Sequence, residues 1–297
     1  MEDLFVKEER KLPISPFKEM AAYEALWTNS DLTFKKISEL FSSKKASRPS
    51  ELIDEHFVTI ATKKLKNILG QKDAIKPGVL ISGTFDYPEQ LRDAKHPIEM
   101  LYFSGNLKYL SSHCGVAVVG SRKPSQSGIK RTQKLVQCLV NDNVTIFSGL
   151  AEGIDTAAHK TTLEMNGRTV AVIGTPLNQF YPKQNKDLQL KIASEHLLIS
   201  QVPYLKYSNQ DYRWNRVFFP ERNKTMSALS NATVIVEAGE TSGSLIQAKA
   251  ALEQGRKLFI LQNCFENPSI TWPKKFEQMG AIRVREYDDI KQALNIK

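Results

Sequence analysis

Cysteine is scarce in this chain of 297 residues, which contains only Cys114, Cys138 and Cys264 and no Cys-x-x-Cys pair. Thiols so few and so far apart argue against a disulfide framework and against a zinc site. Long apolar runs are also missing, since none approaches the roughly 18 residues that a membrane-spanning helix needs. The first ten residues lack the basic start and apolar core of a signal peptide. We therefore expect a cytoplasmic protein that has no membrane contact.

The turn at residues 120–122 has neither the Gly-x-Gly-x-x-Gly spacing of dinucleotide-binding proteins nor the spacing of a P-loop. A different arrangement is present. The small, mostly β-branched run Val116–Val119 ends in this Gly-Ser-Arg turn, and a helical pattern begins near Gln126. A buried strand, a tight turn and a helix are therefore predicted. The turn offers backbone N–H groups, a hydroxyl and a guanidinium at a helix N-terminus, which favours a phosphate.

Acidic side chains are outnumbered, because 41 Lys and Arg stand against 32 Asp and Glu for a formal net charge of +9. Residues 1–75 hold 13 of the basic and 12 of the acidic residues, so the rest of the chain carries nearly all of the excess. A basic domain that also contains a phosphate-type turn is typical of a protein that contacts nucleic acid.

The sequence pattern divides the chain into two units. Residues 1–75 form a small helical module, in which apolar residues recur at helical spacing up to Gly70 with a break near Thr28–Asp31. Residues 76–297 follow a linker at Gln71–Gly78, and there short strands alternate with helices. This alternation predicts an α/β fold: an extended Rossmann-like, mostly parallel sheet with helices on both faces. The predicted strands are Val116–Val119, Thr145–Phe147, Thr169–Ile173, Leu197–Ser200, Thr233–Glu237, Lys257–Leu261 and Ile282–Val284, and the predicted helices are residues 127–140, 155–165, 186–194, 221–229 and 244–254.

Glycine, serine and basic residues gather where the predicted strands end. In such a sheet, ligands bind at the carboxyl ends of the strands, near the switch in strand order. Glycine lets the backbone approach a ligand closely, and the loops offer hydrogen-bond donors. Four such loops, two of them with a cation, predict an anion site. The loops are Gly120-Ser121-Arg122, residues 148–155, Gly174 with Tyr181–Asn185, and residues 238–244.

The segment Arg213–Lys224 interleaves basic and aromatic residues. This mixture suits a phosphate backbone and stacked bases. The alternative is that Trp214, Phe218 and Phe219 are core residues and that the cations cap or pair locally. The spacing favours neither interpretation.

Several motifs, in order and in register, resemble the DNA-processing protein A family (DprA, also called Smf). The resemblance covers roughly residues 85–261. The motifs are Tyr87-Pro88-x-x-Leu91, Gly120-Ser121-Arg122, Ser148-Gly149-x-Ala151-x-Gly153-Ile154-Asp155-x-x-Ala158-His159, Tyr181-Pro182-x-x-Asn185, Phe219-Pro220-x-Arg222-Asn223, Glu237-Ala238-x-x-x-Ser242-Gly243-Ser244-Leu245-Ile246 and Gly255-Arg256.

The resemblance implies an extended Rossmann domain that binds and protects single-stranded DNA in transformation and recombination, forms homodimers and loads a RecA-type recombinase. Carried over position by position, it implies that Arg122 and Lys183 contact phosphates. It implies no catalysis and no cofactor or metal. The implied nucleic-acid site consists of Gly120, Ser121, Arg122, Ser125, Ser148, Gly149, Lys183, Asn185, Arg222, Asn223, Lys224, Ser242, Gly243 and Ser244.

The chain also departs from the family pattern. The family continues past the strand ending at Leu261 with a Pro-Gly turn and a Gly/Asn-rich loop, whereas this chain has Gln262–Pro268. The family's Arg-Asn-Arg is Arg222-Asn223-Lys224 here. No winged-helix domain follows the matched region, so we expect a divergent member without one.

Two constellations could support catalysis instead. Asp155 and His159 lie four residues apart on one predicted helix face and could form an acid–base pair. The simpler interpretation is that Asp155 supports the helix N-terminus and His159 packs beneath the site. Glu237 could be a general base, or it could hold the Gly/Ser loop by hydrogen bonds.

Two functional alternatives to single-stranded DNA binding therefore stay open. One is a nucleotide-binding sensor or nucleotide-cleaving enzyme of the wider Rossmann-like superfamily, in a defence role for example. The other is a protein-interaction role in which the pocket has lost its ligand.

Overall fold

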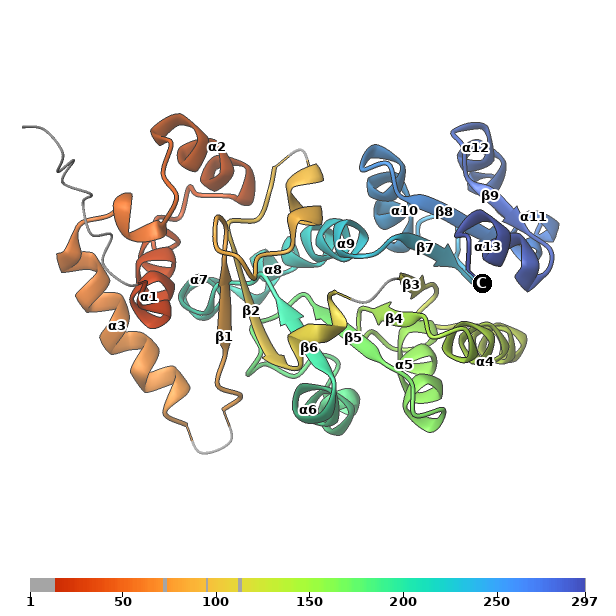
Figure 1. Ribbon diagram of the computed structural model, residues 1–297, viewed down its shortest axis with the longest axis horizontal. Coiled ribbons are helices and arrows are strands. Elements are labelled where there is room, and N and C mark those ends of the chain that lie inside the picture. The colour runs from red at the N-terminus through yellow and green to blue at the C-terminus, as the bar shows by residue number, and fades with distance from the viewer. Residues whose placement is uncertain (1–13, 72–73, 95, 112–113, 297) are drawn as a thin grey trace, which may run out of the picture.

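The computed structural model describes residues 14–71, 74–94, 96–111 and 114–296 (Figure 1). It begins with a helical module made of α1 (Pro16–Leu26), α2 (Phe34–Lys44), the short 3-10 helix η1 (Pro49–Glu51) and α3 (Glu55–Leu69). The helices expected on either side of the break near residue 30 are thus confirmed. Residues 1–13 and 72–73, which belong to the predicted module and linker, lie outside the described residues.

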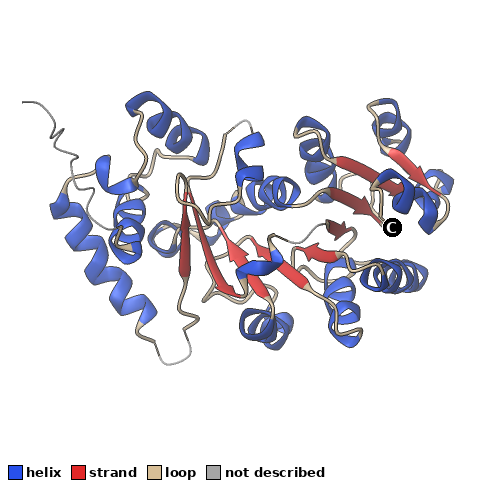
Figure 2. Cartoon of the chain, viewed as in Figure 1, coloured by secondary structure: helices blue, strands red, loops and turns tan. Residues whose placement is uncertain are grey.

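In the described part of the chain, nine strands form one sheet in the order β1-β2-β6-β5-β4-β3-β7-β8-β9 (Figures 1 and 2). The strands from β3 to β9 are parallel to one another, whereas β2 runs antiparallel to both β1 and β6. All seven predicted strands are confirmed to within a few residues, but β1 and β2 were not predicted. The strands are β1 (Gly78–Ile81), β2 (Met100–Gly105), β3 (Gly115–Val119), β4 (Thr145–Ser148), β5 (Thr169–Ile173), β6 (Leu197–Ser200), β7 (Ala232–Ile235), β8 (Lys257–Leu261) and β9 (Ile282–Val284).

Helices cover both faces of the sheet, as the sequence pattern predicts. Successive residues of β3 alternate between the two faces. Val116 and Val118 pack in one core cluster with α4 (Gln126–Asn141) and α5 (Ile154–Glu164). Ala117 and Val119 belong to the larger cluster on the other face, together with α9 (Phe218–Leu229) and α10 (Ser244–Glu253). Figure 1 shows these two helix pairs on opposite sides of the sheet.

Shorter elements complete the chain. A helix predicted over residues 186–194 is confirmed as α6, whereas the helices beyond β8 were not predicted. In the described residues, no helix is both long enough and apolar enough to cross a membrane. The remaining elements are η2 (Glu89–Asp93), η3 (Leu107–Tyr109), η4 (Lys183–Asn185), α6 (Lys186–Glu195), α7 (Tyr204–Asn209), α8 (Tyr212–Asn215), α11 (Gln262–Glu266), α12 (Trp272–Gln278) and α13 (Tyr287–Ala293).

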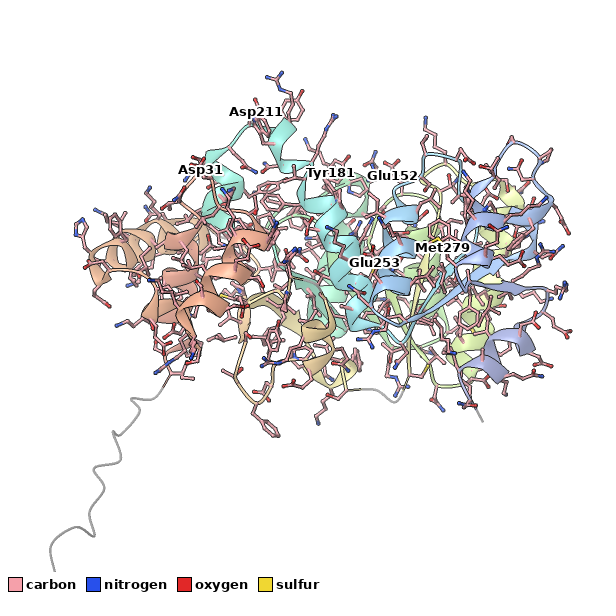
Figure 3. The ribbon with its side chains drawn as sticks, turned by 90° about the horizontal axis from the view of Figure 1, so that it is seen from above. Asp31, Glu152, Tyr181, Asp211, Glu253 and Met279 are labelled. Atoms are coloured by element: carbon pink, nitrogen blue, oxygen red, sulfur yellow. The ribbon has the colours of Figure 1, made fainter. Side chains whose placement is uncertain are left out.

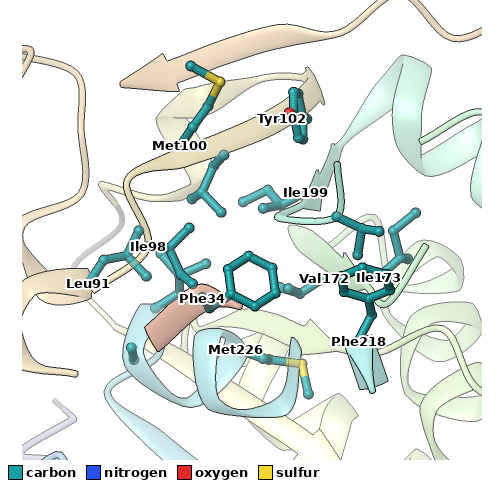
Figure 4. Packing of buried hydrophobic residues seen from close by; sticks show 14 of the residues in the cluster. Phe34, Leu91, Ile98, Met100, Tyr102, Val172, Ile173, Ile199, Phe218 and Met226 are labelled. Atoms are coloured by element: carbon teal, nitrogen blue, oxygen red, sulfur yellow. The ribbon is translucent and has the colours of Figure 1, made fainter. Parts of the chain in front are cut away.

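The helical module shares its core with the sheet. Phe34 of α2 stacks edge-on against Phe218 of α9, with 6.1 Å between ring centroids, and both belong to the cluster shown in Figure 4. The buried Glu24 of α1 accepts hydrogen bonds from the Tyr102 hydroxyl of β2 and from the first two backbone amides of α7, all at 2.7–2.8 Å. The predicted division into residues 1–75 and 76–297 stays a prediction.

The strand order reverses at β3, which has β4 on one side and β7 on the other. The chain therefore leaves β3 and β7 in opposite directions, and a crevice forms at their carboxyl ends. The loops after these strands are residues 120–125 and 236–243. The topology thus places two of the four predicted anion loops next to each other.

Candidate functional site

Two cavities meet at the carboxyl edge of the sheet. The larger, of about 520 Å³, lies between the loop after β3 and the loop before α10. The smaller, of about 460 Å³, lies between the loop after β4 and the segment Phe180–Gln184. Both are lined by Arg122, Ala151, Phe219 and Arg222, so they form one continuous depression. The structure thus brings all four predicted loops to one site.

The Gly-Ser-Arg turn after β3 is clamped from two sides. The backbone N–H of Ser121 donates to the Glu237 carbonyl at 2.6 Å, and the Ser121 carbonyl accepts from the first amide of α5 at 3.2 Å. A side chain at position 120 would collide, because its Cβ would lie 2.6 Å from the Glu237 carbonyl oxygen. Arg122 stays exposed at the tip, and its guanidinium carbon lies 5.9 Å from the Phe219 ring centroid. The turn therefore holds a cation over an aromatic ring at the mouth of both cavities.

Ser125 caps α4. Its hydroxyl accepts from the Gly128 amide at 2.9 Å and donates to the Glu237 carboxylate at 2.6 Å, while its own amide donates to the same carboxylate at 2.7 Å. Glu237 therefore holds the loop after β3, which confirms the structural alternative given for this residue. The Ser125 hydroxyl has its hydrogen bonds within the protein.

Arg222 lies almost fully buried, with 5% of its surface exposed. Its Nη1 atom donates to the carbonyls of Gly149, at 2.5 Å, and Val172, at 2.6 Å. Burial lowers its pKa to about 10, so it remains a cation at neutral pH. A Cβ on Gly149 would lie 1.9 Å from the same Nη1 atom, which explains the glycine. Arg222 thus ties α9 to the ends of β4 and β5 in the floor of the depression.

Asp155 and His159 are both buried and both serve the scaffold. Asp155 accepts from the Gly149 amide at 3.1 Å, and burial raises its pKa to about 6. The Nδ1 atom of His159 lies 2.7 Å from the Thr169 hydroxyl, and burial lowers the pKa of His159 to about 3. His159 is therefore neutral at physiological pH. Asp155 lies in the first turn of α5, and His159 is buried beside the Thr169 hydroxyl, so both positions agree with the simpler interpretation of these residues.

The loop after β5 supplies the second exposed cation. Lys183 lines the smaller cavity together with Arg122. Asn185 is buried instead, and its amide donates to the Leu150 carbonyl at 2.9 Å and to the Thr156 hydroxyl at 2.8 Å. Ser148 is likewise buried, and its hydroxyl donates to the Val118 carbonyl at 2.7 Å. Asn185 and Ser148 thus fix the backbone of the loops, while Lys183 projects into the cavity.

The loop before α10 closes the far side of the larger cavity. The hydroxyls of Ser242 and Ser244 lie 2.8 Å apart, and the Asn223 side chain donates to the Gly243 carbonyl at 3.0 Å. All four residues line this cavity. Lys224 is exposed but is paired with Glu221 at 2.7 Å and lines neither cavity.

Two aromatic rings complete the site. Phe219 packs against Gly174, where a Cβ would lie 2.7 Å from the ring, and its centroid is 5.2 Å from that of Tyr181. Tyr181 is half exposed. The sequence placed Phe219 in the aromatic–basic segment without separating it from Phe218, which is a core residue and only 2% exposed. Of the three aromatic residues for which the core alternative was given, Phe218 is thus a core residue, whereas Trp214 is 68% exposed.

No group of three or more His, Cys, Asp or Glu residues within the described ranges is arranged to hold a metal ion.

The fold and the site define an extended Rossmann-like protein with a basic, ring-lined depression at the switch in strand order. The chain belongs to the DNA recombination-mediator protein A family, whose model matches residues 78–295. The resemblance drawn from the motifs is thus confirmed.

Named relatives support this assignment. Protein Smf of Synechocystis is 38% identical over 216 residues, which cover 68% of this chain and 53% of the relative. DNA processing protein DprA of Streptococcus pneumoniae is 42% identical over 175 residues, which cover 59% of each protein. The matched region thus spans little more than half the length of these relatives.

Solved structures agree with the fold. The structure of DprA from Streptococcus pneumoniae superposes with a TM-score of 0.68 at 28% identity, covering 95% of this chain and 98% of that one. DNA processing protein A from Helicobacter pylori, described for its single-stranded DNA binding mode, superposes with a TM-score of 0.63 at 26% identity, covering 74% of this chain and 96% of that one.

Proposed function

We propose that the chain binds single-stranded DNA in the depression at the carboxyl edge of its sheet. The observation that carries the proposal is the convergence of Arg122 and Lys183, two exposed cations from different loops, on a cavity that the Phe219 and Tyr181 rings also line. Phosphates and bases need this pairing of cations with rings. The related Helicobacter pylori protein is described by its single-stranded DNA binding mode, which supports the same ligand here.

The two cations suit different tasks. A phosphodiester carries only hydrogen-bond acceptors, and all the groups on Arg122 and Lys183 are donors. The guanidinium of Arg122 can bind two phosphate oxygens in a forked geometry, whereas the Lys183 ammonium acts as a point charge. Such contacts carry no sequence information, so we expect binding without base specificity.

The remaining predicted residues divide by burial. Gly120, Ser121, Asn223, Ser242 and Gly243 line the larger cavity and are proposed to donate to phosphate or to let the backbone approach it closely. Ser148, Gly149, Asn185, Arg222 and Ser244 are buried and are proposed to shape the loops. Ser125 and Lys224 lie outside both cavities, so their proposed part is electrostatic or structural.

We propose binding without catalysis. Asp155, His159 and Glu237 are the acid–base candidates. Asp155 accepts from the Gly149 amide, and Glu237 accepts from Ser125. Nδ1 of His159 lies beside the Thr169 hydroxyl, and its Nε2 atom is buried without a hydrogen-bond partner among the described residues. A general acid or base needs to reach a substrate proton directly or through one water. His159 is fully buried and lines neither cavity. Glu237 is held by Ser125, and Asp155 lines the larger cavity with its carboxyl already bonded to the Gly149 amide. These contacts favour a structural role for all three.

The biological setting is also a proposal. A role in recombination or transformation, with a RecA-type recombinase as partner, a homodimeric state and a cytoplasmic location, follows from the family. Sedimentation velocity of the purified chain tests the dimer. Stimulation of RecA filament formation on DNA coated with a single-strand-binding protein tests the partner, and a lack of stimulation would remove the recombinase from the proposal.

The DNA-binding proposal is tested by fluorescence anisotropy with labelled single-stranded oligonucleotides of increasing length, against duplex DNA. We expect length-dependent binding by the wild type. Because each lost charge-assisted contact costs about 1.5–3 kcal/mol, Arg122→Ala/Lys183→Ala should weaken binding by at least a hundredfold.

The matched control is Lys191→Ala/Lys249→Ala, which removes two exposed lysines in helical ion pairs on α6 and α10. This variant loses the same two charges, so a general charge effect would weaken both variants equally. Equal weakening, or tight binding of a free mononucleotide with no dependence on strand length, would refute the proposal and favour the nucleotide-sensor alternative.

A further inference from the structure

Two large aromatic side chains on α8 lie exposed to solvent. Tyr212 is 69% exposed and Trp214 is 68% exposed, and the adjacent Arg213 and Arg216 are exposed as well. Figure 3 shows α8, which begins after Asp211, protruding on the side of the molecule where Tyr181 and Glu152 also lie. Exposed rings this large cost solvation free energy and contribute little to the core. The surface of α8 therefore has the composition of a binding site.

The short helix that carries these rings is held in place. The side chain of Asn215 is buried, and it accepts from Gln210 at 2.6 Å and donates to the Tyr207 carbonyl at 3.1 Å. Asp211 caps the helix by accepting from the Arg213 amide at 2.8 Å. The rings thus stand on an anchored element, so stacking on them does not require the helix to form first.

The helix α8 is continuous with the depression described above. Its last turn leads directly into α9, where the Phe219 amide donates to the Arg216 carbonyl at 3.3 Å. Phe219 lines both cavities and lies beside Tyr181. Trp214 is five residues from Phe219, so their Cα atoms lie no more than about 18 Å apart even along an extended chain. A strand held at Phe219 can therefore reach Trp214 within a few nucleotides.

We propose that α8 is a second stacking platform for the same single-stranded DNA, on which Trp214 and Tyr212 receive bases of the strand that leaves the smaller cavity. Charge favours this occupant, because residues 211–216 carry two arginines against one aspartate. Asp211 pairs with Nε of Arg213 at 3.1 Å, and the surface around the rings keeps a net positive charge that would attract a polyanion. Rings alternating with cations along one edge are the usual arrangement for stacked bases and their phosphates. This inference rests on the proposed function, since it extends the same site.

The intrinsic fluorescence of Trp214 can be used to detect stacking on this platform. Of its three tryptophans, Trp27 and Trp272 are buried, at 2% and 3% exposure, and Trp214 alone is exposed. Stacking of a base on Trp214 should quench its fluorescence, while the two buried tryptophans stay unchanged. We would titrate the full chain with oligothymidylates from about 4 to about 16 nucleotides, a usual range of site sizes. Quenching should appear only with the longer oligonucleotides, which reach past the cavity.

Variants separate the platform from the cavity. Trp214→Ala/Tyr212→Ala should weaken binding of long oligonucleotides at least about thirtyfold, and leave short ones unchanged, because each of the two stacked bases contributes about 1–3 kcal/mol. Trp214→Phe keeps a ring and should retain the affinity. The control is Phe57→Ala/Phe85→Ala, which removes two rings that are 52% and 103% exposed on other elements and should change nothing.

The outcomes are distinguishable. Two results would refute stacking on α8 without affecting the proposed binding in the cavity. One is equal affinity of Trp214→Ala/Tyr212→Ala and the wild type at every oligonucleotide length, and the other is binding of long oligonucleotides without quenching. A change in sedimentation of the DNA-free variant would instead make α8 a contact between copies of the chain. Failure of the wild type to bind at any length would overturn the proposed function together with this extension.

Discussion

Arg222 is a cation in the family's Phe-Pro-x-Arg-Asn motif, but it is almost fully buried in the floor of the depression rather than exposed to a ligand. Its Nη1 atom donates to two backbone carbonyls, one directly after β4 and one in β5. Its charge sits in this floor with Asp155 nearby, and the attraction to this carboxyl partly offsets the cost of burial. The residue therefore positions two anion loops at once, and its effect on a ligand passes through Gly149.

Gly149→Ala should destabilise the fold. The added Cβ would lie 1.9 Å from Nη1 of Arg222, so either the loop moves or the buried guanidinium loses its hydrogen bonds. Overpacking of this kind costs about 1–3 kcal/mol, and disturbing a buried charge adds to it. We expect the free energy of unfolding to fall by about 3 kcal/mol in urea denaturation.

Gly243→Ala is the matched control for this variant. A Cβ at position 243 would meet nothing within 4 Å, and the residue has right-handed helical angles, φ −61° and ψ −20°. Its stability should stay within about 0.5 kcal/mol of the wild type. If the two alanine variants unfold at the same urea concentration, the role given to Arg222 is wrong.

At the scale of secondary-structure elements, the sequence predicts those helices and strands whose apolar residues form a regular pattern. The strands with apolar β-branched runs, such as Val116–Val119, and the helices between them are predicted because both faces of a parallel sheet are buried. The strand β1 is four residues long and begins at Gly78, inside the predicted linker, so its signal is weak. The loops of the site were predicted from glycine and serine spacing. The burial of the Arg222 and Asn185 side chains was not predicted, because burial of a polar side chain depends on partners far away in sequence.

Glu24 of α1 is hydrogen-bonded to β2 and α7, and its titration makes the free energy of unfolding depend on pH. Burial raises its pKa to about 7 from an ordinary value of 4.5. The folded chain therefore holds a proton that the unfolded chain has released, and the free energy of unfolding should fall as pH rises from about 4.5 to about 7. One such proton is worth about 3 kcal/mol over this window.

Glu24→Gln should remove this contribution. Urea denaturation at several pH values measures it as the difference between wild type and variant, which cancels the opposing dependence of the buried His159. We expect the free energy of unfolding of Glu24→Gln to rise relative to that of the wild type as pH rises. A difference that is constant between pH 4.5 and 7 would show that Glu24 does not bind a proton in the folded chain.

At the scale of the whole molecule, charge is distributed to match the site. The formal net charge is +9, and residues 1–75 are nearly neutral overall. The excess therefore belongs to the part of the chain that forms the sheet and its anion loops. A positive domain concentrates a polyanion around it and speeds association, in a manner that salt suppresses. The exposed cations of the anion loops and the net positive charge of this part of the chain would thus both attract a polyanion.

This distribution predicts how binding depends on salt. Each phosphate that a cation neutralises on a single strand contributes about −0.7 to the slope of log K against log salt concentration. If Arg122 and Lys183 each neutralise one phosphate, Arg122→Ala/Lys183→Ala should make the slope shallower by about 1.4. Lys191→Ala/Lys249→Ala should keep the wild-type slope, because those lysines pair with glutamates away from the cavities. Anisotropy titrations over a series of salt concentrations measure all three slopes. Parallel lines for the wild type and Arg122→Ala/Lys183→Ala would mean that the two cations make no phosphate contact, whatever their effect on affinity.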